Sequence, residues 1–138
     1  MISDNQVLVM KVLFFANILW AGVPGLLITI FPKFAQTQIL PYMVGSVPQD
    51  MMTVRILSSI WLSVGLVSLF GLFNPLPVAA VFVVQIIYKV VWVSVAVLPA
   101  LLQGETRALP LAVGFVVMIV GFAFATPWAF LLGTEAAA

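Results

Sequence analysis

Cysteine and histidine are both absent from the 138 residues of this sequence. Without cysteine, the chain has no disulfide, no thiolate nucleophile, and no thiolate ligand for zinc or an iron–sulfur cluster. Without histidine, it lacks the usual general base of enzymes and the imidazole that most often ligates haem or copper. We therefore expect no cofactor bound through His or Cys, and no enzyme built on a Ser–His or Cys–His pair.

Charged residues are scarce as well. The sequence has five Lys/Arg and four Asp/Glu, or 7% of the chain, whereas 64% of its residues are hydrophobic. Soluble domains typically have about a quarter of their residues charged, so these few cannot cover the surface with groups that water solvates. We expect most of the surface to face lipid. The net charge of +1 provides no basic face, so nucleic acid is not an expected partner.

Four long apolar runs follow one another, at residues 6–31, 50–73, 77–101 and 109–132. Each run exceeds the roughly 20 helical residues that cross a hydrocarbon core of about 30 Å. Prolines and polar residues separate the runs, and none alternates polar and apolar residues as barrel strands do. The sequence therefore predicts an all-α fold, an integral membrane four-helix bundle that forms a single transmembrane domain over residues 1–138.

The connections between the runs carry the charges that orient them. Lys33, Arg55 and Arg107 lie in or near the first and third connections, whereas the side of the termini has only Lys11. The positive-inside rule then places these connections in the cytoplasm and both termini outside, in a multi-pass protein of a bacterial inner membrane. We expect Lys33 and Arg55 to contact lipid head groups. The connection at 32–48 is too short to span, and we expect it at the interface or over one end of the bundle.

Small residues and one proline indicate how the helices pack. Small residues let membrane helices approach closely. They recur in three of the runs and include Gly22, Gly25, Gly65, Gly114 and Gly121. Pro24 leaves a carbonyl near Trp20 without its helical partner, which predicts a distortion of the first helix.

Lys89 is the most informative residue, because it lies near the middle of the third run. A charged lysine at that depth costs at least about 2.5–3.5 kcal/mol on insertion scales. Gln85, Tyr88 and Trp92 are its neighbours on the same helix, at the i−4, i−1 and i+3 positions. Every Asp and Glu falls at the end of a run or in a connection, so the sequence offers no carboxylate at the depth of Lys89.

Three interpretations of Lys89 stay open. In the first, the amine is neutral or hydrogen-bonded within a polar layer of its own chain. In the second, it meets an anion or polar head group, such as a lipid phosphate, a quinone carbonyl or a carboxylate. In the third, it pairs with an acid on another subunit. A tryptophan face can also stabilise a desolvated ammonium by about 2 kcal/mol. The candidate ligand- or partner-binding residues are Asn17, Trp20, Trp61, Gln85, Tyr88, Lys89 and Trp92.

Several segments of the chain resemble those of known membrane proteins. Residues 55–61 read RILSSIW and lead to the glycine and leucine at 65–66, residues 85–92 read QIIYKVVW, and residues 126–128 read TPW. Over residues 20–132 the chain resembles small, largely uncharacterised four-span bacterial membrane proteins of the DoxX-like and BphX-like families. The resemblance implies a membrane partner of a quinone-linked redox enzyme, as in some DoxX-type proteins. The sequence shows no cofactor motif of its own.

Two functions are compatible with these residues. The first is a non-catalytic integral membrane subunit that packs against a larger membrane complex. The second is a binding or carrier protein for a quinone, lipid or other amphiphile, with a mid-membrane pocket around Lys89. The expected partners are membrane lipids and other membrane protein subunits. An enzyme that uses the same residues is the least favoured interpretation, since the sequence shows no paired carboxylates at membrane depth.

Overall fold

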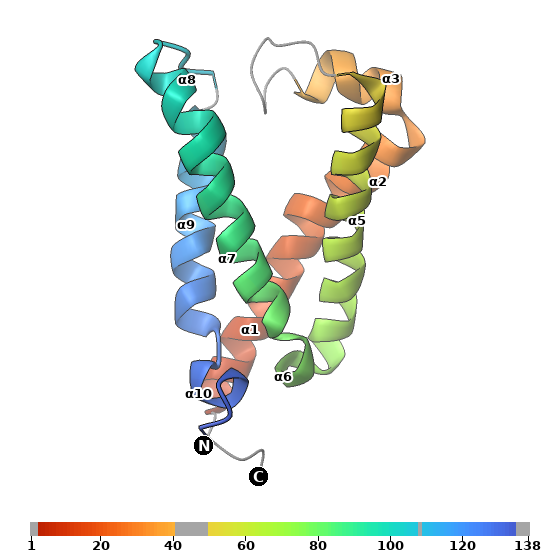
Figure 1. The fold of residues 1–138 in the computed structure, drawn as a ribbon. Coiled ribbons are helices and arrows are strands. Elements are labelled where there is room, and N and C mark those ends of the chain that lie inside the picture. Colours follow the sequence, from red (N-terminus) through yellow and green to blue (C-terminus); the bar gives the residue numbers. More distant parts are fainter. Residues whose placement is uncertain (1–2, 41–49, 108, 135–138) are drawn as a thin grey trace.

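The computed structural model describes residues 3–40, 50–107 and 109–134, and every secondary-structure element in these ranges is helical (Figure 1). The first apolar run forms α1 (Asp4–Asn17), the π-helical η1 (Ile18–Gly22) and α2 (Val23–Ile30). The second forms α5 (Met51–Phe73). The third forms α7 (Ala80–Trp92), the π-helical η3 (Val93–Val97) and α8 (Leu98–Leu102), and the fourth forms α9 (Leu109–Ala125). The shorter elements are α3 (Pro32–Phe34), the π-helical η2 (Ala35–Ile39), α6 (Pro75–Val78) and α10 (Trp128–Leu131).

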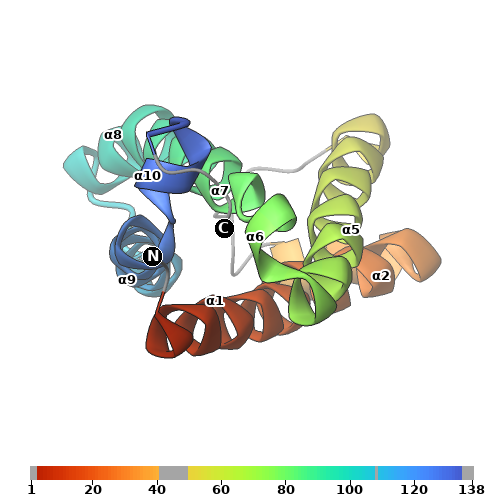
Figure 2. The ribbon, with the colours of Figure 1, turned by 90° about the horizontal axis from the view of Figure 1, so that it is seen from below.

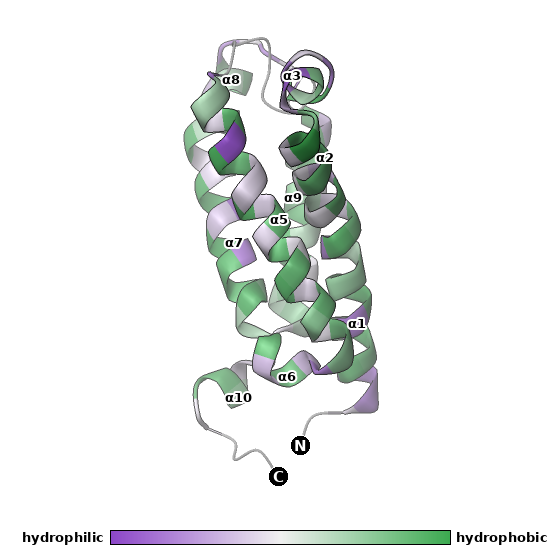
Figure 3. Ribbon diagram, turned by 90° about the vertical axis from the view of Figure 1, so that its right-hand side faces the viewer, coloured by the Kyte–Doolittle hydropathy of each residue, from purple (hydrophilic) through white to green (hydrophobic). Residues whose placement is uncertain are grey.

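Three helical stretches are long and apolar enough to cross a membrane, namely Asp4–Ile30, Met51–Phe73 and Pro75–Leu102. They correspond to the first three predicted spans, so the all-α prediction and these three helices are confirmed. Hydrophobic residues dominate the length of the helices, and the strongly hydrophilic ones lie mostly toward the ends (Figure 3). This distribution is typical of helices whose middle lies in hydrocarbon.

The fourth apolar run differs from its prediction as one helix over 109–132. α9 ends at Ala125, and α10 begins only at Trp128. The break is caused by Pro127, which has no N–H to donate and disfavours helical geometry in the residue before it. The 17 residues of α9 rise about 26 Å, somewhat less than the roughly 30 Å of a hydrocarbon core.

Polar side chains begin the first two long helices. The Ser3 hydroxyl accepts a hydrogen bond from the backbone N–H of Gln6 at 3.2 Å. The Asp50 carboxylate accepts from the N–H groups of Met52 and Thr53, at 2.9 and 3.0 Å. Each cap satisfies N–H groups that have no partner within the helix, so Ser3 and Asp50 fix where these helices begin.

Three π-helical turns interrupt the helices, and each ends two residues before a proline in the sequence. η1 precedes Pro24, η3 precedes Pro99, and η2 precedes Pro41, which lies outside the described residues. A proline cannot donate to the carbonyl one turn before it, and a wider turn is one way in which a helix adjusts to that loss. The predicted distortion of the first helix is therefore a π-helical turn that contains Trp20.

Two helix pairs form the body of the bundle. α2 packs along α5, and α7 packs along α9. α1 contacts both α5 and α9, and it crosses from one pair to the other (Figure 2). The pairs approach each other at the end that holds α6 and α10, which we call the closed end, and diverge toward α3 and α8, which we call the splayed end (Figure 1).

Candidate functional site

Three stacked phenylalanine rings join α1 to the pair α7 and α9 near the closed end. Phe14 from α1 lies 4.4 Å from Phe82 of α7, centroid to centroid, and Phe82 lies 5.1 Å from Phe122 of α9. All three side chains are fully buried. Gly71 of α5 lies against the ring of Phe14, where a side chain would not fit. We call the three rings the aromatic floor, because they separate the closed end from the polar residues above them.

Three polar residues follow the floor by one helical turn toward the splayed end. Asn17 and Gln85 lie three positions after floor residues on α1 and α7, which run in the same direction. Ser68 lies three positions before Gly71 on α5, which runs in the opposite direction. Residues three positions apart share one face of a helix, so these side chains lie at one level of the bundle. Together with Lys89 they form what we call the polar layer.

Lys89 is only 2% exposed and is enclosed by its own chain. Its ammonium donates a hydrogen bond to Oε1 of Gln85, one turn earlier on α7. Its Nζ lies 5.3 Å from the ring centroid of Tyr88, 5.1 Å from that of Phe115 and 5.3 Å from that of Phe122. Ring faces attract a desolvated cation electrostatically. The rings around the ammonium are therefore one tyrosine and two phenylalanines, and not the tryptophans that the sequence suggested.

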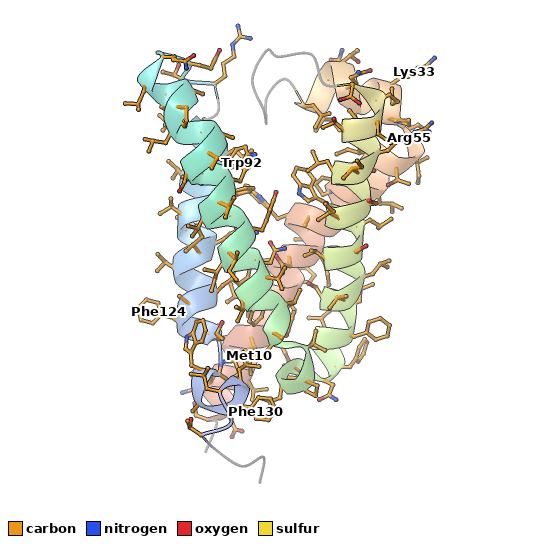
Figure 4. All side chains as sticks on the ribbon, in the orientation of Figure 1. Met10, Lys33, Arg55, Trp92, Phe124 and Phe130 are labelled. Atoms are coloured by element: carbon orange, nitrogen blue, oxygen red, sulfur yellow. The ribbon has the colours of Figure 1, made fainter. Side chains whose placement is uncertain are left out.

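A second aromatic cluster lies on the splayed side of Lys89. The indole N–H of Trp61, on α5, donates to the Tyr88 hydroxyl of α7 at 2.9 Å. The Phe115 ring of α9 contacts Tyr88 and Trp92, at centroid distances of 6.0 and 4.9 Å. Trp92 lies on the side of α7 that faces α5 (Figure 4). We call these four side chains the aromatic roof, and the polar layer lies between roof and floor.

Two members of the polar layer have no hydrogen-bond partner within the described residues. The side-chain oxygen and nitrogen of Asn17 are both buried and unpaired, and so is the hydroxyl of Ser68. Both residues are fully buried. A buried amide or hydroxyl without a partner costs about 1–3 kcal/mol in proteins, so this layer keeps polar groups at a cost in stability.

Trp20 lies apart from this arrangement. It belongs to η1, and 45% of its surface is exposed. Its ring lies against Gly114 of α9, where an added Cβ would be 3.1 Å from Cζ2 of the indole. The structure thus collects Asn17, Gln85 and Lys89 into one layer and borders it with Trp61, Tyr88 and Trp92, but places Trp20 on the surface.

The predicted head-group residues lie far from the polar layer. Lys33 and Arg55 are both exposed at the splayed end, on α3 and in the first turns of α5 (Figure 4). Arg107 and Glu105 also belong to this end, with 4.0 Å between Nε and Oε1, and both are solvent-accessible. Such an exposed pair adds little stability.

Three contributors to the site were not predicted from the sequence, namely Phe115, Phe122 and Ser68. Phe115 and Phe122 are seven positions apart on α9 and therefore share one face, which was the available signal. Within the described residues, no three His, Cys, Asp or Glu side chains gather as metal ligands do. What the site provides is a buried cation, buried amides and surrounding rings, which together suit the binding of a polar group.

Comparison with known proteins adds no relative. No family model matches the chain, and neither a curated protein nor a solved structure matches it significantly. The resemblance to DoxX-like and BphX-like proteins therefore stays a prediction from the sequence.

Proposed function

We propose that this protein is a multi-pass membrane protein that binds a small amphiphilic molecule inside its helix bundle, at the polar layer. The observation that carries the proposal is the burial of Lys89 with Asn17, which has no partner within the described residues. Ionisable groups inside membrane helices are costly and typically mark binding or transport sites. The polar layer would receive the polar group of the ligand, and the roof would contact its apolar part.

The enclosure of Lys89 favours this function over a membrane subunit. A subunit was attractive because an acid on another chain would compensate the amine. At 2% exposure, however, Lys89 is covered by Gln85 and three rings of its own chain. A carboxylate on a neighbouring subunit has no access to the ammonium from outside the bundle, whereas a molecule that enters between the helices would reach it.

The proposed topology has four crossings in a bacterial inner membrane. α9 would complete the fourth crossing together with α10, since an apolar helix of 17 residues is close to the required length. Lys33, Arg55 and Arg107 lie toward the splayed end, whereas Lys11 lies on α1. The positive-inside rule would then put the splayed end in the cytoplasm and both termini outside.

Ligand retention tests the proposal. The protein would be purified in lipid nanodiscs, and native mass spectrometry would identify amphiphiles that stay bound. We expect the wild-type protein to retain one, and the Lys89→Met variant to lose it, because methionine keeps the length of the side chain without its charge. Lys11→Met is the matched control, since Lys11 is exposed. A wild-type protein that retains no added quinone, fatty acid or lipid would refute the proposal.

A non-catalytic subunit of a larger membrane complex is the second candidate. It is favoured by the splayed end, where the two helix pairs form separate hydrophobic clusters instead of one core. A partner helix could pack between such clusters, and the resemblance to DoxX-type proteins implies a redox enzyme as the partner. Purification from native membranes in mild detergent tests this role. A chain that always migrates alone, with full stability, would count against it.

A further inference from the structure

The hydrogen-bonding groups of the polar layer are unequally divided between donors and acceptors. A lysine ammonium has three N–H donors and no acceptor, and each carboxamide adds two further donors. The acceptor of Gln85 is already used by Lys89, which leaves the side-chain oxygen of Asn17 as the one unpaired carboxamide acceptor among the described residues of the layer. When Lys89 is protonated, the layer also carries a positive charge, and no described carboxylate pairs with it. A group that completes this layer must therefore accept several hydrogen bonds, donate few, and carry a negative charge.

We infer that the ligand is a monoanionic amphiphile whose carboxylate binds in the polar layer, as in a long-chain fatty acid. This inference rests on the proposed function and specifies the chemistry of its ligand. An ionised carboxylate only accepts hydrogen bonds, at about four lone-pair positions. One carboxylate oxygen would accept a hydrogen bond from Lys89. The other would accept hydrogen bonds from the amide N–H groups of Asn17 and the hydroxyl of Ser68. The charge of the ammonium is then neutralised inside the bundle.

Other polar groups fit the layer less well. A quinone carbonyl accepts hydrogen bonds but brings no charge, so the ammonium would stay uncompensated. A phospholipid head group carries two acyl chains and is much larger than a carboxylate. The four residues of the polar layer are each no more than 3% exposed, between an aromatic floor and an aromatic roof. A single small anionic group suits this enclosed position best.

The direction of the apolar tail follows from the two aromatic clusters. The floor is fully buried and stacked across three helices, which closes the bundle on that side. On the other side, Trp92 is partly exposed, and the helix pairs form separate hydrophobic clusters. The acyl chain would therefore extend from the polar layer past the roof toward the splayed end, between the pair α2 and α5 and the pair α7 and α9.

Quenching of tryptophan fluorescence provides the test. A stearic acid brominated at mid-chain would be titrated into the protein in nanodiscs, beside its methyl ester and a brominated alkyl quinone. Trp61 and Trp92 border the expected path of the chain, so bound probe should quench them. We expect the acid to bind at least about tenfold more tightly than the ester, because a hydrogen-bonded charge pair is lost in the ester.

A substitution at Asn17 separates the charge effect from misfolding. Asn17→Asp places a carboxylate of the chain itself in the polar layer, at almost the same volume. We expect this variant to fold with an unchanged or raised melting temperature. It should bind the acid about tenfold more weakly, because the introduced carboxylate lies where the carboxylate of the ligand would bind and repels it. Asn17→Leu should also weaken binding, while Lys11→Met should leave it unchanged.

The outcomes distinguish the inference of a carboxylate ligand from the proposed function, the binding of an amphiphile. Equal binding of the acid and its ester, or a preference for the quinone, would overturn the carboxylate while leaving an amphiphile site in place. Unchanged acid binding by a folded Asn17→Asp variant would overturn it as well. Failure of all three probes to quench the wild-type protein would overturn the proposed function itself.

Discussion

The two ends of this bundle are built differently. At the closed end, one hydrophobic cluster takes residues from α1, α7 and α9, with Phe82 stacked between Phe14 and Phe122. At the splayed end there are two clusters, one in the pair α2 and α5 and a smaller one around Val97 and Ala112. One end is therefore a joint between the helix pairs, whereas the other leaves each pair to pack by itself. The polar layer lies at the transition between the two.

The path of the first helix explains the difference. α1 contacts both pairs, but after the π-helical turn η1 its continuation, α2, packs against α5. Close backbone contacts fix this second half. A Cβ at Gly65 would lie 2.3 Å from Cα of Gly22, and a Cβ at Gly25 would lie 2.4 Å from the backbone nitrogen of Leu62. The first helix thus bridges the bundle in its first half and belongs to one pair in its second.

Loss of the central ring of the aromatic floor should have the largest effect on stability. Phe82→Ala leaves a cavity between two other buried rings, and comparable substitutions cost about 3 kcal/mol or more. We expect the free energy of unfolding in mixed micelles to fall by about that amount. We also expect a broader distribution of distances between spin labels on α5 and α9 at the closed end.

Phe124→Ala is the matched control for Phe82→Ala, because it removes the same kind of ring from an exposed position. Phe124 lies on α9, the helix of the floor residue Phe122, and is 83% exposed. Its substitution should change the free energy of unfolding only slightly, since lipid replaces its contacts. Equal effects of the two substitutions would contradict the view that the floor joins α1 to the pair α7 and α9.

The glycine contacts of the splayed end should come next in size. Gly25→Ala places a methyl group against the backbone of α5, which cannot move aside as a side chain can. Overpacking of this kind costs about 1–3 kcal/mol, so we expect a loss of about 2 kcal/mol measured by thermal unfolding. Gly121→Ala is the control, because its Cβ would meet Leu13 at an ordinary 3.5 Å. A variant at Gly25 as stable as wild type would contradict the close approach of α2 and α5.

The hydrogen bond between Trp61 and Tyr88 should have a smaller effect. It links α5 of one helix pair to α7 of the other. Tyr88→Phe removes only a hydroxyl, and we expect a loss of about 1 kcal/mol. A double-mutant cycle with Trp61→Phe isolates the bond. The loss of stability in the double variant should be smaller than the sum of the two single losses by about 1 kcal/mol. Strict additivity would show that this link does not hold the roof together.

The sequence predicted the elements of this fold better than their mutual packing. Apolar runs of sufficient length identify the helices, and Pro24 identifies the distortion of the first helix. The end of α9 at Ala125 was missed, because the apolar run continues beyond the proline. The register between helices was missed too, since helices that are apolar on every side do not mark which face turns inward.

The candidate site shows the same limit. The hydrogen bond between Lys89 and Gln85 follows from their i, i−4 spacing on one helix, and it was within reach of the sequence. The rings of Phe115 and Phe122 come from another helix, so their place around the ammonium depends on how α9 is rotated against α7. Trp20 has the residue type expected at such a site, but its position in η1 turns it toward Gly114 and the surface.

The smallest expected effect concerns the start of α5, at the splayed end. The hydroxyl of Thr53 donates to the Asp50 carboxylate, and with the backbone N–H groups of Thr53 and Met52 it lowers the pKa of Asp50 below the ordinary 3.8. A carboxyl whose pKa is lower in the folded state stabilises the fold above its unfolded pKa. That contribution is lost as the pH falls through the folded pKa, so the effect of Asp50 should decline below about pH 4.

Asp50→Asn isolates this titration, because asparagine also caps a helix but carries no charge that acid can remove. The melting temperatures of the two proteins should differ by a constant amount above about pH 5 and converge or cross below about pH 4. The polar layer should not contribute to this difference, since Asp50 lies at the splayed end and the layer is buried in both proteins. Parallel pH profiles over the whole range would show that the cap acts through hydrogen-bond geometry alone, and that the charge of Asp50 has no part in holding α5 at its start.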